Sequence, residues 1–147
     1  MKVLIVEDDP FKRSQIEQEI KLRFVAEVYS ASSLQDAMNI LVDTIFDAVL
    51  LDMAIPSHSG DAGSSDIYSQ PVGGLDVLMY LSDEKRSERI MIVTQYPTIE
   101  YNRDHVPLNK IKSRFESDEI FNVDAISLFD EGGLWRPRLQ EFLENVS

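Results

Sequence analysis

Cysteine is absent from the 147 residues of this chain, so neither a disulfide nor a thiolate zinc site is available to it. Its stability must therefore come from a hydrophobic core. With 44% hydrophobic residues, a chain of this length can form one well-packed domain and is short for two. The lack of cysteine suits a reducing compartment, and we expect a cytoplasmic protein.

Basic residues are few: 14 lysines and arginines stand against 26 aspartates and glutamates, for a formal net charge of −12. Such a charge opposes general binding to nucleic acid or to an anionic membrane surface, and we expect direct contact with neither. The partners we expect are proteins, in particular proteins that carry complementary positive charge.

Long hydrophobic runs are also missing. The first apolar run covers only residues 3–6 and is followed at once by acidic residues, which is far too short for a signal peptide or a membrane-spanning helix. We therefore expect a soluble protein that is not exported by a cleaved signal.

Segments with strand composition alternate with segments of helical period, which is the pattern of a parallel sheet covered by helices. The predicted strands are residues 2–6, 25–29, 47–51, 90–94 and 121–129. The predicted helices begin at Pro10, after Ser32 or Ser33, at Leu75, near Leu108 and at Pro137.

Two of these helices have apolar stripes that predict their buried sides. In the first helix the stripe consists of Phe11, Ile16, Ile20 and Phe24. In the second, apolar residues recur at helical spacing over 34–45, the cleanest such stripe in the chain.

Acidic residues stand at the ends of two predicted strands. Glu7, Asp8 and Asp9 follow the first strand, and Asp52 follows the third. Ligands of open parallel sheets bind at the carboxyl ends of the strands, so we expect the two groups to meet in one pocket. Several carboxylates there favour a hard cation such as Mg²⁺. Taken alone, the first group also fits a solvated strand end whose charges favour the next helix dipole.

The stretch 57–74 is the only part of the chain with the composition of a linker, since it is rich in Ser, Gly and Asp. Too few apolar residues lie on either side to divide the core. We therefore predict a single domain over residues 1–147 with a loop insertion at about 57–74.

Four stretches are similar, in order, to the motifs of one family. Residues 2–10 look like its first strand with an acidic pair, and 49–56 like its phosphorylation strand. Residues 74–78 and 90–94 look like the start of its third helix and its fourth strand. Over roughly two thirds of its length the chain thus resembles the receiver domain of response regulators, the CheY-like phosphoacceptor of two-component signalling.

The resemblance implies a fold and a set of site residues. The fold is α/β: a five-stranded parallel sheet of flavodoxin-like order 2-1-3-4-5 with helices on both faces. Asp52 would accept a phosphoryl group, and Thr94 would hydrogen bond it, although a strand-end threonine alone more often bonds backbone. The implied ligands of Mg²⁺ are Glu7, Asp8, Asp52 and the Met53 backbone carbonyl. The cation is needed because an aspartate is a weak nucleophile toward an anionic phosphate.

One departure from the family is a missing lysine. The family's fifth strand ends in a lysine that pairs with the phosphoryl group, and residues 124–130 contain none. The lysines beyond the fourth strand, Lys110 and Lys112, are predicted on the fourth helix. Arg136 is a candidate replacement, although an arginine before Pro137 is more simply an exposed residue at a helix start.

The insertion at about 57–74 is a second departure, because the family has only a few residues there. It lies beside Asp52 in the sequence and is a candidate lid or partner contact. Residues 94–98 and 133–137 resemble an atypical branch of receivers, which fits the missing lysine.

The sequence leaves three functions open. The first is a stand-alone response regulator that accepts a phosphoryl group on Asp52 from a sensor histidine kinase or phosphotransfer protein and switches its binding to a downstream protein. The alternative is a receiver-fold interaction module that has lost phosphorylation. A Mg²⁺-dependent phosphatase of the haloacid dehalogenase type is disfavoured, since Ala54 stands where that family has its acid/base aspartate. We therefore expect no enzyme.

The resemblance also predicts where the protein signals. The family generally uses the surface formed by the fourth helix, fifth strand and fifth helix, and this surface is also a candidate for homodimer formation. Phosphorylation would bias that surface through a two-state rearrangement.

Overall fold

The computed structural model describes residues 1–58 and 73–146. The main sheet has five parallel strands: β1 (Lys2–Val6), β2 (Glu27–Ala31), β3 (Ala48–Leu51), β4 (Arg89–Thr94) and β7 (Val123–Leu128). Within these residues, five helices lie around it: α1 (Pro10–Arg23), α2 (Leu34–Leu41), α3 (Gly73–Asp83), α4 (Leu108–Ser117) and α5 (Trp135–Val146). The strand order β2-β1-β3-β4-β7 confirms the predicted flavodoxin-like order.

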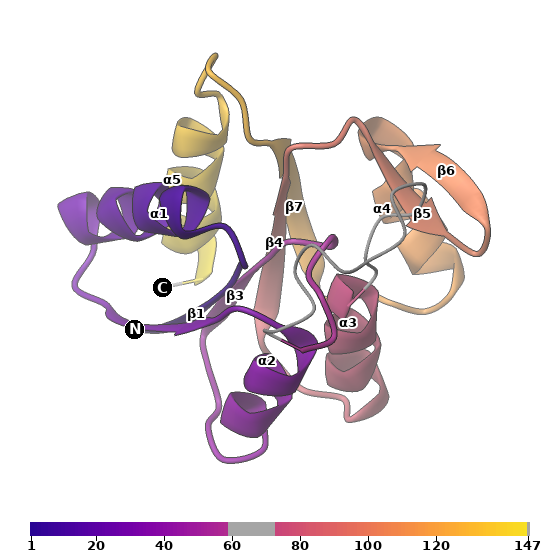
Figure 1. Ribbon diagram of the computed structural model, residues 1–147, viewed down its shortest axis with the longest axis horizontal. Coiled ribbons are helices and arrows are strands. Elements are labelled where there is room, and N and C mark those ends of the chain that lie inside the picture. The colour runs from indigo at the N-terminus through magenta and orange to yellow at the C-terminus, as the bar shows by residue number, and fades with distance from the viewer. Residues whose placement is uncertain (59–72, 147) are drawn as a thin grey trace.

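Helices cover both faces of the sheet, with α1 and α5 on one side and α2, α3 and α4 on the other (Figure 1). Side chains of a strand alternate between the faces. Val3 and Ile5 therefore pack toward α1 and α5, while Leu4 and Val6 pack toward the other helices. Because both faces are covered, the central strands are almost wholly apolar and buried, which is why they were recognisable in the sequence.

A two-stranded hairpin, β5 (Thr98–Tyr101) and β6 (Asp104–Pro107), follows β4 and precedes α4 in the sequence. It was not predicted. Its two-residue turn consists of Asn102 and Arg103, both with positive φ, as a tight hairpin requires. Tyr101 fixes the hairpin to α4: its ring lies edge-on to Phe115 at 5.1 Å, and its hydroxyl hydrogen bonds Asp118. The hairpin therefore extends the α4 side of the molecule (Figure 1).

Several predicted elements had the wrong bounds: the fifth predicted strand begins at Val123, and the third and fifth helices begin two residues earlier than predicted, at Gly73 and Trp135. The second strand lies two residues later than predicted, and Val25 is 98% exposed. Helix α2 ends at Leu41, so Val42 and Ile45, which the helical stripe placed on the buried side, are exposed. Val25, before β2, and Val42 and Ile45, after α2, are apolar residues that neither the sheet nor the helices bury.

The predicted buried side of α1 is wrong at its first turn. Phe11 is 67% exposed, whereas its neighbour Lys12 is buried in line with Ile16 and Ile20. The helix begins after the N-cap Asp9, whose side chain accepts a hydrogen bond from the Phe11 amide. This starting point turns Lys12, rather than Phe11, toward the sheet.

No helix within residues 1–58 and 73–146 combines the length and the apolar character needed to cross a membrane.

Candidate functional site

Strands β1 and β3 bring two carboxylates to one edge of the sheet. They pair in parallel, with Val6 opposite Leu51, so that Glu7 and Asp52 each come one residue after the paired ends. The Asp52 amide continues the ladder with a hydrogen bond to the Val6 carbonyl at 3.0 Å. The position of both acids thus follows from strand register.

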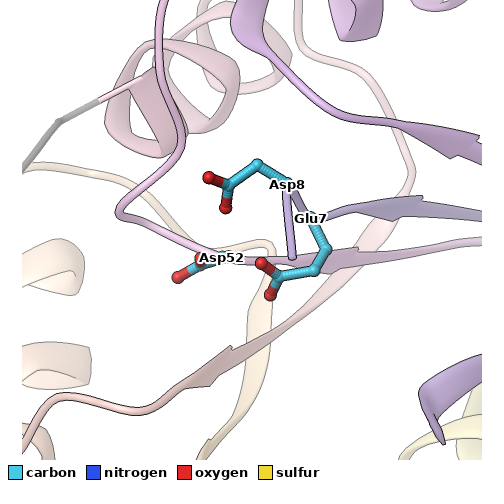
Figure 2. Close-up of side chains that lie close together, drawn as sticks. All are labelled: Glu7, Asp8 and Asp52. Carbon is cyan, nitrogen blue, oxygen red and sulfur yellow. The ribbon is translucent and has the colours of Figure 1, made fainter. Parts of the chain in front are cut away.

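Glu7, Asp8 and Asp52 form an acidic cluster, in which each residue offers a carboxylate oxygen within 4.8 Å of the others. Figure 2 shows the three side chains gathered beside the ends of the strands. Glu7 and Asp52 are only 1% and 2% exposed, while Asp8 is half-buried. The structure therefore brings together the two acidic groups that lie 45 residues apart in the sequence.

Each buried carboxylate has one oxygen held by backbone. The Asp9 amide donates to Glu7 Oε2 at 3.1 Å, and the Ala54 amide donates to Asp52 Oδ1 at 3.2 Å. The other oxygens, Glu7 Oε1 and Asp52 Oδ2, are buried and accept no hydrogen bond of good geometry from the described residues. They face the ammonium of Lys12 instead.

Lys12 is the site residue that the sequence analysis missed. Its side chain is buried, and its Nζ lies 2.5 Å from Glu7 Oε1 and 3.7 Å from Asp52 Oδ2. It also donates to the Val93 carbonyl at 2.8 Å and to Gln95 Oε1 at 3.1 Å. Its position four residues before Ile16, on the apolar side of α1, was the signal that could have identified it.

Burial raises the pKa values of Glu7 and Asp52. Burial, reinforced by the charge of Asp52, raises the pKa of Glu7 to about 8 against the opposing effect of Lys12. Burial also raises the pKa of Asp52, while the Lys12 charge lowers it. Lys12 faces Glu7 and Asp52, and Asp8 adds a third carboxyl group to the cluster. When all three are ionised the cluster has excess negative charge, which a further cation would compensate.

Thr94 ends β4, next to β3, and is 1% exposed. Its Oγ1 accepts a hydrogen bond from the Tyr96 amide at 3.1 Å, which is the strand-end arrangement common for threonine. The hydroxyl proton remains available as a donor, since accepting a bond uses only an oxygen lone pair. Its neighbours Val93 and Gln95 hold Lys12, so Thr94 is connected to the cluster through that lysine.

The Met53 carbonyl lies where α3 begins and accepts a hydrogen bond from the Gly74 amide at 3.2 Å. A side chain at Gly74 would not fit, because its Cβ would lie 2.4 Å from both the Asp52 carbonyl oxygen and Met53 Cα. The start of α3 therefore packs directly on the backbone that carries Asp52. A carbonyl has a second lone pair, which leaves Met53 able to bind a cation.

The candidate replacement Arg136 is not at the site. Its guanidinium pairs with Glu19 at 3.0 Å, donates to Gln15 at 2.9 Å and stacks on Trp135 at 4.5 Å, which fixes α5 to α1. Arg136 is therefore not placed to replace the missing lysine, and the simpler interpretation of this arginine, a residue at a helix start, agrees with its position in the first turn of α5. Lys110 and Lys112 lie exposed on α4, as predicted.

The predicted insertion at about 57–74 lies mostly outside the described residues, which resume at Gly73, the first residue of α3. Its predicted roles as a lid or partner contact remain predictions.

Comparison with known proteins identifies the family. The response regulator receiver domain matches residues 3–108, and the chain belongs to that family. The Detocs response regulatory protein DtcB of Vibrio alginolyticus is 32% identical over 97% of this chain and 99% of its own length. The family prediction made from the four sequence stretches is thus confirmed.

Solved structures support the same fold. The response regulator TrrA of Thermotoga maritima, in complex with Mg²⁺-BeF, superposes with a TM-score of 0.64 at 19% identity, covering 99% of this chain and 98% of that one. The response regulatory domain of mrkE from Klebsiella pneumoniae gives 0.66 at 20% identity, with the same coverage. This chain therefore has the receiver fold, that of a domain family which acts in signalling.

Proposed function

We propose that this receiver domain accepts a phosphoryl group on Asp52 and thereby switches its binding to a partner protein. The observation that carries the proposal is Asp52 Oδ2, a buried carboxylate oxygen beside Glu7 and Asp8 that accepts no well-directed hydrogen bond from the described residues. Such an oxygen is available both as a nucleophile and as a cation ligand.

The proposed donor is a phosphohistidine on a sensor histidine kinase or a phosphotransfer protein. An Asp52 oxygen attacks phosphorus in line and forms the new P–O bond. The P–N bond to the imidazole breaks, its electron pair stays on the nitrogen, and that nitrogen takes a proton from solvent. The relation to the Detocs response regulatory protein supports a place in a regulatory system of this kind.

The residues present fit a bound Mg²⁺. The proposed ligands all offer oxygen, and they are Glu7, Asp8, Asp52 and the Met53 carbonyl. Their excess negative charge and the buried oxygens without hydrogen bonds favour a hard cation, and the complex of TrrA with Mg²⁺-BeF supports the same choice. When bound, Mg²⁺ would neutralise the phosphate oxygens during transfer.

Thr94 is the proposed switch residue. Its hydroxyl would donate to the new phosphoryl group and draw the start of the following loop toward Asp52, which disturbs its present bond to the Tyr96 amide. Because the hairpin begins at Thr98, only a short loop separates this movement from β5 and α4. The partner and dimer surface over α4, β7 and α5 remains a prediction.

A second function is an interaction module that works without phosphorylation. The end of β7, which carries no lysine, is the observation that favours it. In both cases we propose that residues 1–147 act as a single receiver-like domain without catalytic turnover.

The test is intact mass after incubation with Mg²⁺ and acetyl phosphate, with Asp52→Asn as the control. We expect the wild type to gain one phosphoryl group and the variant to gain none. A wild type that binds Mg²⁺ in a titration but gains no mass, with acetyl phosphate or with a phosphorylated histidine kinase, would favour the interaction module.

A further inference from the structure

The receiver family places a lysine at the end of its last strand, and this chain has Leu128 and Phe129 there. A phosphoryl group on Asp52 would add negative charge to a site that already holds three carboxylates. The site therefore needs a cationic hydrogen-bond donor from elsewhere in the chain.

We propose that Lys12, from the first turn of α1, binds the phosphoryl group on Asp52 in place of the strand-end lysine. This inference rests on the proposed function of Asp52 and assigns to it a residue from the opposite end of the chain. Lys12 is 1% exposed, and its Nζ lies 3.7 Å from Asp52 Oδ2.

The ammonium of Lys12 is held in a defined direction. Two of its three N–H groups are directed to the Val93 carbonyl and Gln95 Oε1, at 2.8 and 3.1 Å. The third faces Glu7 Oε1 at 2.5 Å, with Asp52 Oδ2 next to it. An ammonium fixed on two sides needs only to redirect its third N–H to reach a group attached to Asp52.

Lys12 Nζ also lies close to the end of β7, where the family has its lysine. The ammonium lies 5.7 Å from the centre of the Phe129 ring, and Phe129 directly follows β7. Its amide donates to the Thr94 carbonyl at 2.7 Å, so it belongs to the same edge of the sheet. Lys12 thus brings its charge from α1 to the place beside the end of β7.

Phosphoryl capture would then exchange one ion-pair contact of Lys12 for a hydrogen bond to the phosphoryl group. The third N–H, which now faces Glu7 Oε1, would turn to a phosphoryl oxygen, and Glu7 would be one of the residues that hold Mg²⁺. The bonds to Val93 and Gln95 would remain. These two residues flank Thr94. A movement of the Lys12 ammonium toward the phosphoryl group would therefore act on both neighbours of the proposed switch residue.

A purely structural Lys12 would only compensate the charge of Glu7. The variant Lys12→Met distinguishes the two roles by its affinities for Mg²⁺ and for a phosphoryl analogue. Methionine keeps an apolar side chain of similar length and lacks the ammonium. A structural lysine predicts an equal effect on Mg²⁺ binding and on a phosphoryl analogue. A phosphoryl-binding lysine predicts a selective loss of the analogue.

The experiment uses the full chain and two titrations: Mg²⁺ alone, then beryllofluoride at saturating Mg²⁺, both by calorimetry. For Lys12→Met we expect Mg²⁺ affinity equal to or above that of the wild type, since a competing cation is gone. We expect beryllofluoride affinity to fall about 10- to 100-fold, the usual effect of one charge-assisted hydrogen bond. The matched control is Lys21→Met, which removes an exposed lysine of the same helix, paired with Glu17 at 2.8 Å.

A second measurement needs no variant that might misfold. In wild-type protein with isotope-labelled lysine, the Lys12 ammonium signal should shift when beryllofluoride is added to the Mg²⁺-loaded protein, and the Lys21 signal should not. Lys12→Met that binds beryllofluoride as tightly as the wild type, or an unmoved Lys12 signal, would overturn the inference alone. A wild type that binds no beryllofluoride and takes no phosphoryl group would overturn the proposed function, and this inference with it.

Discussion

The Lys12 ammonium lies 2.5 Å from Glu7 Oε1, which pairs the first turn of α1 with the residue that ends β1. Even with this partner, burial and the charge of Asp52 hold the pKa of Glu7 near 8. Without a further cation to compensate its charge, Glu7 therefore keeps its proton at neutral pH, and this gives the first prediction.

We expect the metal-free protein to lose stability as pH rises from about 4.5 to about 8. The pKa of Glu7 is higher in the folded state than in the unfolded chain, so the protonated form favours folding and this contribution disappears as the folded protein loses its proton. The effect is on the order of a few kcal/mol. Urea unfolding of the wild type and of Glu7→Gln across this range measures the effect, since the two proteins share Asp52 and differ only in whether residue 7 can ionise.

Saturating Mg²⁺ should remove most of this difference, because a bound cation stabilises the ionised carboxylate. If, without metal, the free energy of unfolding changed with pH equally in the wild type and in Glu7→Gln, ionisation of Glu7 would not be the cause of the pH dependence.

Thr94→Ala should separate phosphoryl capture from its consequence. Asp52 and the acidic cluster remain, so the variant should still gain one phosphoryl group by intact mass. The hydroxyl that would draw the loop inward is lost, so NMR shifts of Thr98–Tyr101 upon beryllofluoride binding should become much smaller. Thr94→Ser keeps the hydroxyl and is the control. Equal hairpin shifts in the alanine variant and the wild type would exclude Thr94 as the switch.

Gly74→Ala should destabilise the protein and disturb the site. The added Cβ would lie 2.4 Å from the backbone of Asp52 and Met53, so either α3 or the strand end must move. We expect a loss of about 1 to 3 kcal/mol in the free energy of unfolding and weaker Mg²⁺ binding, measured by urea unfolding and calorimetry. Gly132→Ala is the control, because its nearest neighbour would be the Asp130 side chain at 3.3 Å. Unchanged stability of Gly74→Ala would contradict the close approach.

Arg86→Met should be far more damaging than the loss of an ordinary surface arginine. Arg86 pairs with the fully buried Glu88 at 2.5 Å and donates to the Leu41 and Thr44 carbonyls, which joins the ends of α2 and α3. Removing it leaves the buried carboxylate of Glu88 without a cation, with only the Phe46 amide of the described residues still donating to it, and we expect a loss of about 3 to 5 kcal/mol in the free energy of unfolding by urea.

The matched control is Arg89→Met, which breaks an ion pair with Asp124 whose two side chains are 39% and 36% exposed. Its expected cost is below about 1 kcal/mol, because exposed pairs contribute little. Similar losses in the two variants would show that burial of Glu88 does not determine the effect.

The hairpin shows why one part of the fold escaped prediction. Its strands have four residues each: β5 alternates buried and partly buried residues, and three of the four residues of β6 are exposed. Ile99, Tyr101 and Val106 are buried only because the hairpin packs near α4. A pattern this short is ambiguous until a partner surface is known.

What the sequence determined by itself is the sheet and the edge at which its acids meet. Continuous apolar runs such as residues 3–6 and 48–51 predict buried strands. The carboxyl ends of parallel strands all lie at one edge of the sheet. The positions of Glu7 and Asp52 follow from that geometry. The same reasoning located Thr94 at the end of β4.

The tertiary structure alone decided which cation reaches the acids. Phe11 and Lys12 are neighbours, and only the phase of α1, set by its N-cap and its packing on the sheet, turns the lysine inward and the phenylalanine outward. The partner of that lysine, Val93, lies 81 residues away in the sequence. A contact of this kind depends on how a helix is rotated over a sheet, and a local pattern does not carry that information.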